Sequence, residues 1–252
     1  PVSDYNAPVL HIKKTGYKKA GAMVNALHRI EAFDLNPGRI PARKYFVEGL
    51  LGSGWEGEVY RVMERTTGIR GAMKLFYPER NFKDKAVRFY ATKLHRLRHC
   101  PVVIQYHHSD TFTFRRVKIT FLISYLAEGQ LLSDFIAAQP GKRLRPFEAL
   151  HLLNALATGI EQIHHAREYH GDIHDGNILV TRSGINFNVK LVDFYQWGRT
   201  DRSKIREDVI ELVRILYDAV GGRKRYAGQP PMIKNICRGL RRDLISRKFP
   251  TA

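Results

Sequence analysis

The sequence is poor in cysteine and has no long apolar run. Its two cysteines, Cys100 and Cys237, lie far apart and in no metal-binding spacing, which favours a reducing compartment. No apolar stretch is long enough to cross a bilayer, and no signal peptide leads the chain. We therefore expect a soluble, cytoplasmic protein that is not transmembrane.

Acidic residues are scarce relative to basic ones. The chain has 42 Lys and Arg against 24 Asp and Glu, which gives a formal charge of +18. Such an excess implies acidic partners, namely nucleic acid, anionic lipid or an acidic protein, although it can also serve solubility alone. From Gly221 onward a single acid, Asp243, accompanies nine basic residues. We expect this basic C-terminal helix to bind an acidic partner. The nine are Arg223, Lys224, Arg225, Lys234, Arg238, Arg241, Arg242, Arg247 and Lys248.

A polar cluster stands out between residues 170 and 194. In His170–Val180 (HGDIHDGNILV), Asp172 lies five residues before Asn177 and an apolar strand follows directly. A second short strand, Val189–Val192, leads into Asp193. Two carboxylates and one amide on a loop and two strands supply the oxygen ligands that Mg²⁺ prefers beside a triphosphate. The alternative is an ordinary polar turn between a helix and a hairpin.

A glycine-rich turn lies upstream between two predicted strands, Tyr45–Leu51 and Val59–Met63. It reads GSGWEGEV and contains Gly52, Gly54 and Gly57. Glycines at these positions let backbone N–H groups approach a phosphate closely. A helix after the turn would favour a dinucleotide-binding fold, but a strand follows here. The turn therefore predicts a phosphate-binding loop within a hairpin.

Lys74 lies on the next predicted strand, Ile69–Phe76. It follows Gly52 by 22 residues, which is about the length of one hairpin. A solvated strand lysine would be the usual outcome. The residues on either side of Lys74 are all apolar, which indicates that this lysine is buried for a purpose.

These elements, in this order, resemble the glycine-rich loop, the phosphate-binding lysine, the HRDxxxxN catalytic loop and the DFG motif of the protein-kinase-like superfamily. The resemblance implies an α+β, bilobal fold. The N-lobe would be a five-stranded antiparallel sheet plus helix C, and the C-lobe would be reduced and mainly helical. We expect an N-terminal arm and helix in residues 1–44, the N-lobe in 45–125 and the C-lobe in 126–252. The other predicted elements are a helix at Lys18–Phe33, helix C at Asp84–Arg98, strands at Val102–Tyr106 and Val117–Tyr125, a helix at Pro146–Ala166 and helix F at Glu207–Tyr217.

The resemblance also implies residue roles. Asp172 would accept the proton of the acceptor hydroxyl, Lys74 would bind the phosphates of ATP, and Asn177 and Asp193 would hold Mg²⁺ or Mn²⁺. Ile123 would be the gatekeeper beside the adenine. Other nucleotide contacts would come from Leu51, Gly52, Gly54, Gly57, Val59, Ala72, Leu126 (through its backbone) and Leu179. Plain core packing is the alternative for the apolar members of this set.

One departure from the family pattern concerns helix C. The predicted helix contains no glutamate, and Tyr90 stands at or next to the place where the lysine's partner is expected. We expect Glu79, Asp84 or Asp193 to lie near Lys74 instead.

Further departures lie after the catalytic loop. Tyr195 replaces the glycine that follows Asp193 and Phe194, and only 14 residues separate Asp193 from Asp208. Asp208 matches the helix F aspartate that anchors the catalytic loop. No APE motif occurs, so the activation segment is short, as in the RIO kinases and minimal kinases of bacterial effectors.

The sequence of the catalytic loop does not decide which kind of molecule accepts the phosphate. Gly171 replaces the arginine that ordinarily receives a phosphorylated activation loop, and His174 stands where Ser/Thr protein kinases usually place lysine. The pattern HGDxHxGN is similar to that of aminoglycoside and choline kinases, whereas the glycine loop is closer to protein kinases.

We therefore carry three hypotheses. The first is an ATP-dependent phosphotransferase of the atypical, minimal Ser/Thr protein kinase type. The second is a kinase of a small molecule, lipid or glycolipid; an aminoglycoside is a poor acceptor because the chain's charge repels a polycation. The third is a nucleotide-binding pseudokinase scaffold. For the localisation, the alternative to a cytoplasmic protein is a secreted effector that acts inside a host cell.

Overall fold

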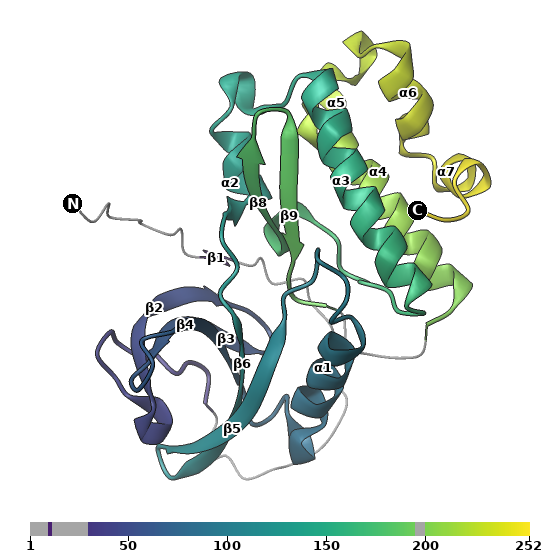
Figure 1. The fold of residues 1–252 in the computed structure, drawn as a ribbon. Helices are drawn as coiled ribbons and strands as arrows, with labels where there is room; N and C mark the ends of the chain where they lie inside the picture. The colour runs from purple at the N-terminus through teal and green to yellow at the C-terminus, as the bar shows by residue number, and fades with distance from the viewer. Residues whose placement is uncertain (1–9, 12–29, 195–199) are drawn as a thin grey trace. The chain divides into compact units, whose positions relative to one another are not determined.

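The computed structural model describes residues 10–11, 30–194 and 200–252. The chain folds into two compact units (Figure 1). The first unit comprises Pro1–His95 and Gln105–Leu126, and the second comprises Arg96–Ile104 and Ala127–Ala252. Each unit has its own sheet and its own helices.

The first unit is built on a sheet of six strands in the order β1-β2-β3-β4-β6-β5. Strands β2 to β6 pair antiparallel, and the two-residue β1 adds a parallel edge to β2. The five-stranded antiparallel sheet with one helix is therefore confirmed. The elements are β1 (Leu10–His11), β2 (Tyr45–Ser53), β3 (Gly57–Glu64), β4 (Arg70–Phe76), α1 (Lys85–Arg96), β5 (Tyr106–Phe114) and β6 (Val117–Tyr125), with 3-10 turns at Pro41–Arg43 and Phe82–Asp84.

The fourth antiparallel strand lies later in the chain than its sequence prediction, which was Val102–Tyr106. Residues 102 and 103 belong to the second unit, where Val103 forms a bridge with Leu191. The Val102 side chain packs so closely on Gly159 that a Cβ there would lie 2.7 Å from it. The apolar run was therefore core rather than strand. The observed strand β5 is more polar and starts where that run ends.

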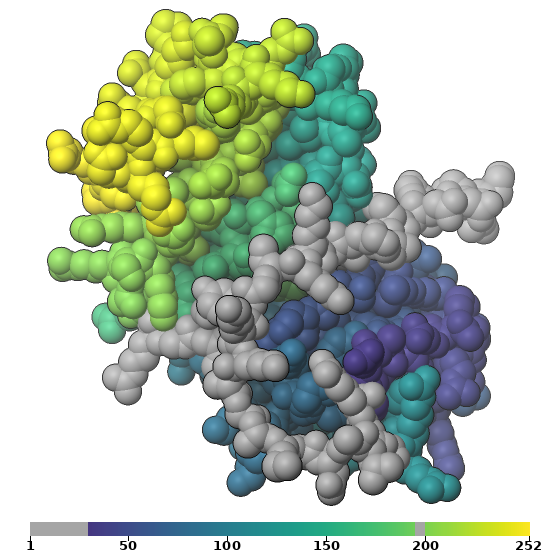
Figure 2. All heavy atoms as spheres, turned by 180° about the vertical axis from the view of Figure 1, so that it is seen from behind, coloured from purple at the N-terminus to yellow at the C-terminus, as the bar shows by residue number. Residues whose placement is uncertain are grey.

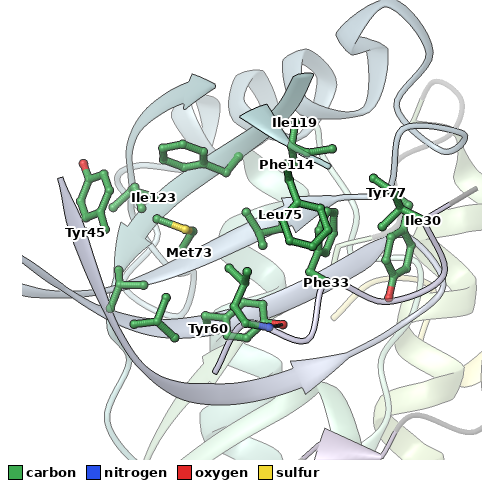
Figure 3. Packing of buried hydrophobic residues seen from close by; sticks show 14 residues of the cluster. Ile30, Phe33, Tyr45, Tyr60, Met73, Leu75, Tyr77, Phe114, Ile119 and Ile123 are labelled. Carbon is green, nitrogen blue, oxygen red and sulfur yellow. Dashed lines mark hydrogen bonds between the residues drawn. The ribbon is translucent and has the colours of Figure 1, made fainter. Parts of the chain in front are cut away.

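The two faces of the first sheet are covered by different segments. On one face α1 packs the ring of Tyr90 against Phe76, at 6.4 Å between ring centroids. On the other face lies an apolar cluster to which residues upstream of β2 contribute (Figure 3). Residues 30–33 are not helical, and the rest of the predicted Lys18–Phe33 helix lies outside the described residues. The cluster comprises Ile30, Phe33, Leu35, Tyr45, Val47, Tyr60, Val62, Met73, Leu75, Tyr77, Phe114, Ile119, Phe121 and Ile123.

A buried carboxylate fastens this upstream segment to the sheet. Glu58 on β3 is 4% exposed, and it accepts hydrogen bonds from the Phe33 N–H at 2.9 Å and the Tyr77 hydroxyl at 2.9 Å. The hydroxyl of Tyr60 also donates to Glu58 and accepts from the Leu35 N–H at 3.1 Å. Because a buried charge is tolerated only when it is well hydrogen-bonded, this network makes residues 33–35 part of the folded unit.

The second unit combines a three-stranded sheet, in the order β7-β8-β9, with a set of helices. Helices α3 and α4 contact each other, and the C-terminal helices α6 and α7 pack on α4 (Figures 1 and 2, where the C-terminal segment is yellow). The elements are β7 (Gln130–Leu131), α2 (Leu132–Ala137), α3 (Pro146–His165), β8 (Ile178–Ser183), β9 (Asn186–Leu191), α4 (Arg202–Ala219), α5 (Gly222–Arg225), α6 (Pro231–Cys237) and α7 (Arg242–Lys248). Short 3-10 turns lie at Pro140–Lys142, Asp175–Asn177, Tyr226–Gly228 and Arg238–Leu240.

The basic C-terminal segment forms three short helices rather than the single helix predicted. Of its nine basic residues, all but Arg238 are exposed. Two of them form ion pairs: Arg242 with Glu207 of α4, one of whose bonds measures 3.0 Å, and Arg241 with Asp243 at 3.4 Å. In the part of the chain that the structure describes, no helix is both long and apolar enough to span a membrane.

Candidate active site

Lys74 lies in the first unit at the centre of β4. Its cross-strand partners are Val59 on β3 and Leu122 on β6, so these residues share one face of the sheet. Ala72, two positions earlier, shares that face as well. Lys74 is 9% exposed, which agrees with the burial expected from its apolar neighbours. Val59 and Ala72 are only partly buried, as residues lining an open slot would be.

A carboxylate of the glycine-rich loop contacts Lys74. Glu56 Oε2 lies 3.2 Å from Lys74 Nζ. On the side of α1, Nζ lies 4.5 Å from the centroid of the Tyr90 ring. The sequence analysis expected Glu79, Asp84 or Asp193 beside Lys74 and overlooked Glu56; Asp193 belongs to the second unit. Asp84 accepts hydrogen bonds from Asn81 and Thr120.

The glycine-rich loop closes as a tight turn over the end of the β3–β4 pair. The Gly54 N–H donates to the Gly57 carbonyl at 2.8 Å, and Gly52 pairs with Val59 across the hairpin. A Cβ on Gly57 would lie 1.8 Å from the backbone oxygen of Leu75. Only glycine allows this approach.

The other apolar residues predicted to contact the nucleotide do not all lie on the sheet face of Lys74. Ile123 pairs with Met73, so it lies on the sheet face opposite Lys74 and belongs to the apolar cluster. This position does not support the gatekeeper role, because the register puts Ser124 beside Ala72 instead. Leu51 is the extra residue at a bulge in β2, where the alternation of faces is interrupted. Leu126 follows β6, and Leu179 lies on β8 of the second unit; both are partly buried.

In the second unit, Asp172 and His174 form a pair on the catalytic loop. His174 Nε2 lies 3.7 Å from Asp172 Oδ2, while His174 Nδ1 accepts from the Gly176 N–H at 3.1 Å. Burial alone would raise the pKa of Asp172, but the neighbouring His174 outweighs it and the pKa is lowered. The same contact raises the pKa of His174 above its ordinary value of 6.5. The contact therefore favours an ionised carboxylate at Asp172, and a second proton on His174 would replace the bond that Nδ1 accepts from Gly176.

Asn177 has the environment of a metal ligand. It is 2% exposed, and its Nδ2 donates to the Asp172 carbonyl at 3.0 Å and to Asp172 Oδ2 at 3.1 Å. Those bonds turn its Oδ1 the other way, and this buried oxygen has no hydrogen-bond partner among the described residues. An unpaired buried acceptor is costly unless a cation or another donor reaches it. Asn177 therefore fits the Mg²⁺ or Mn²⁺ predicted here.

Asp193 follows the β8–β9 hairpin in an unusual backbone conformation. Its φ is +53°, in the left-handed region that non-glycine residues seldom occupy. Phe194 is 2% exposed, and its ring lies 4.4 Å from that of His170. His170 Nε2 donates to the Val192 carbonyl at 3.1 Å, so the start of the catalytic loop is tied to the strand end that carries Asp193. Tyr195 lies outside the described residues.

Asp208 on α4 anchors the catalytic loop, as predicted. It is 1% exposed, and its two oxygens accept the backbone N–H groups of His170 and Gly171, each at 2.8 Å. His164 Nε2 of α3 is 3.1 Å from Asp208 Oδ2. One buried carboxylate therefore joins two helices to the loop that carries Asp172 and Asn177.

Comparisons with known proteins agree with this geometry. The sequence profile described as "Protein kinase domain" matches residues 45–210. The chain is similar to myosin-IIIa of Mus musculus and of Homo sapiens, at 25% and 24% identity over 160 residues, which is 61% of this chain and 10% of each relative. It is also similar to the probable serine/threonine-protein kinase fhkE of Dictyostelium discoideum, at 30% identity over 162 residues, which is 61% of this chain and 22% of that protein. The chain thus spans less than a quarter of the length of these relatives.

Proposed function

Because this chain belongs to the protein kinase domain family, we propose that it transfers the γ-phosphate of ATP to a hydroxyl group of a serine or threonine in a protein. The observation that carries the proposal is the arrangement around Asn177. Its amide is bonded to Asp172, its buried Oδ1 lacks a partner among the described residues, and Asp208 holds the loop in place. Phosphoryl transfer relies on positioning and charge neutralisation, which such a loop supplies.

The roles follow from the chemistry of each side chain. Asp172, kept ionised by His174, accepts the proton of the attacking hydroxyl. Lys74 contacts phosphate oxygens through its ammonium group. Asn177 and Asp193 would hold Mg²⁺ or Mn²⁺, which supplies charge neutralisation at the phosphates when bound.

A small-molecule or lipid hydroxyl is the second candidate acceptor. His174 in place of the usual lysine and the short stretch between Asp193 and Asp208 favour it. The exposed basic residues of the C-terminal segment support an anionic acceptor or an acidic partner. The fhkE relative, by its name a probable serine/threonine kinase, supports the first candidate.

The test is incubation with radiolabelled ATP and Mg²⁺, using the intact chain and an Asp193→Asn variant. We expect label on a basic test protein or on the chain itself, and none with the variant, because its amide no longer offers a charged ligand to the cation. Circular dichroism should show both proteins folded alike. Label on extracted lipid or sugar would select the second candidate.

Nucleotide binding without any transfer would mean a pseudokinase. Full turnover by folded Asp193→Asn protein would remove Asp193 from the metal site.

A further inference from the structure

Lys74 is held between a carboxylate and an aromatic ring. Its side chain is 11% exposed, its Nζ is 3.2 Å from Glu56 Oε2, and the centroid of the Tyr90 ring is 4.5 Å from Nζ. An ammonium group removed from water to this extent must be compensated by an opposite charge or a ring face. Both are supplied within the first unit.

Helix α1 cannot supply the carboxylate. Its sequence, KAVRFYATKLHR, contains no acidic residue. Tyr90, which faces Lys74 from this helix, is 2% exposed and packs its ring on Phe76. The side of the lysine that faces α1 is therefore filled by an aromatic face rather than by a charge.

Glu56 is carried by a turn that is fastened at several points. Its carbonyl accepts the Tyr77 N–H at 2.9 Å, beyond the end of β4. The next residue, Gly57, lies against the Leu75 backbone so closely that no side chain fits. The preceding residue, Trp55, has the Arg80 guanidinium 4.0 Å from its ring centroid. The backbone that carries Glu56 is therefore held in place by contacts on both sides of this residue.

We propose that Glu56 is the positioning residue for Lys74, and that it replaces the glutamate which α1 lacks. The proposal rests on the proposed function, since it assigns Lys74 to the phosphates of ATP. An ammonium group has three N–H donors. One of them on Glu56 orients the group toward the phosphate oxygens. The alignment of Lys74 is therefore set by the glycine-rich loop and does not require a charged residue on α1.

The main test compares Glu56→Gln with a matched control, Glu64→Gln. Glu64 lies on β3 and pairs with Lys44 at 2.9 Å, so the control removes a similar ion pair from the same hairpin. We expect Glu56→Gln to lower kcat/KM for ATP by roughly tenfold to a hundredfold, the scale for misplacing a catalytic group. The control should match the parent chain, and both variants should keep the parent melting temperature. Glu56→Asp, which keeps the charge on a shorter side chain, should restore part of the loss.

A binding measurement separates this proposal from the proposed function. The dissociation constant of a fluorescent ATP analogue is measured for Glu56→Gln, Lys74→Met and the double variant. If Glu56 acts through Lys74, Glu56→Gln weakens binding in the parent chain and has no further effect once Lys74 is methionine. This result is readable even if no acceptor is phosphorylated, in which case the kinase proposal alone fails.

Two outcomes would overturn the assignment. Tighter ATP binding by Glu56→Gln would mean that the carboxylate competes with phosphate for Lys74. Equal losses from Glu56→Gln with and without Lys74 would mean that Glu56 acts on the loop alone.

Discussion

Among single residues, His174 gives the catalytic loop a chemistry that a lysine would not. A lysine at this position stays charged at all physiological pH values, whereas a histidine loses its proton in that range. The hydrogen bond that His174 donates to Asp172, more than any other contact, raises the pKa of His174, so the charge persists above the ordinary value of 6.5. As the pH rises further, the imidazole becomes neutral and the charge beside Asp172 is lost.

The pH at which activity falls on the alkaline side should therefore depend on which residue stands at position 174. For a group whose pKa is raised by folding, the favourable contact is fully present below 6.5 and is lost as pH passes the raised value. We expect kcat/KM of the parent chain to decline through that range, and His174→Lys to extend the active plateau upward. His174→Gln should be weakened where the parent imidazole is charged and should approach the parent above that range.

The measurement is the pH dependence of kcat/KM from about pH 5 to about pH 9, where an essential acid or base appears as a limb. The acid limb is informative too. Since His174 lowers the pKa of Asp172, His174→Gln should move that limb to higher pH. Identical profiles for all three proteins would contradict a role for the pair.

Among elements, α4 has two separable roles, one through its N-cap residue Asp201 and one through Asp208. Asp201 caps the helix by accepting the N–H groups of Ser203 at 2.8 Å and Lys204 at 3.1 Å. Asp208 lies about two turns further along the helix, and its carboxylate accepts hydrogen bonds from the catalytic loop. The same substitution at both positions therefore distinguishes helix stability from loop anchoring.

Asp208→Asn should lower both stability and turnover, whereas Asp201→Asn should change neither. Asparagine caps a helix as well as aspartate does. At 208, however, one of the two buried backbone donors would face an amide N–H₂, at a cost of about 1–3 kcal/mol. Urea denaturation and kcat of the two variants provide the comparison. A normal kcat in Asp208→Asn would contradict the anchoring role.

Sequence patterns located most elements because their signals are local. The glycine-rich turn, the β8–β9 hairpin and the helices around 146–165 and 202–219 follow from glycine, apolar alternation and helical spacing within the segment itself. The link from Asp208 to the loop followed from the family resemblance and is confirmed by its hydrogen bonds.

Features that depend on how distant segments pair could not be predicted from local sequence patterns. The face on which Ile123 lies is fixed by the register of β4 with β6, and a shift of one residue exchanges the two faces. Likewise, Val102 and Val103 looked like a strand because burial by a distant helix also selects apolar residues. Glu56 precedes Lys74 by 18 residues, and only the register of β3 with β4 brings the two together, so no local pattern marks the contact.

For the molecule as a whole, the hydrogen bonds of Glu58 with Tyr60 and Tyr77 make the free energy of unfolding depend on pH in the alkaline range. Burial first, and the Glu58 carboxylate second, raise the pKa of Tyr60 and of Tyr77 above the ordinary value of 10.0. The folded chain therefore keeps these phenol protons at pH values where the unfolded chain has lost them. Stability is full below about 10 and falls as pH rises above it.

Above that pH, each such tyrosine should remove about 1.4 kcal/mol of stability per pH unit while its folded form stays protonated. Tyr77→Phe should lessen this slope, and Tyr226→Phe, in the second unit, should not. Urea denaturation followed by Trp55 fluorescence in a Trp197→Phe background reads the first unit, because the chain has 2 tryptophans. Equal slopes for Tyr77→Phe and the parent would contradict the linkage.

The segment upstream of β2 has a practical consequence for anyone who shortens this protein. The family match starts at residue 45, yet Ile30, Phe33 and Leu35 are already part of the apolar cluster. A recombinant fragment trimmed to the matched boundary would uncover a face of the sheet and deprive Glu58 of the Phe33 donor. Such a fragment should be prone to aggregate, since exposed apolar patches favour association. For crystallisation or inhibitor screening, the cut belongs before Ile30.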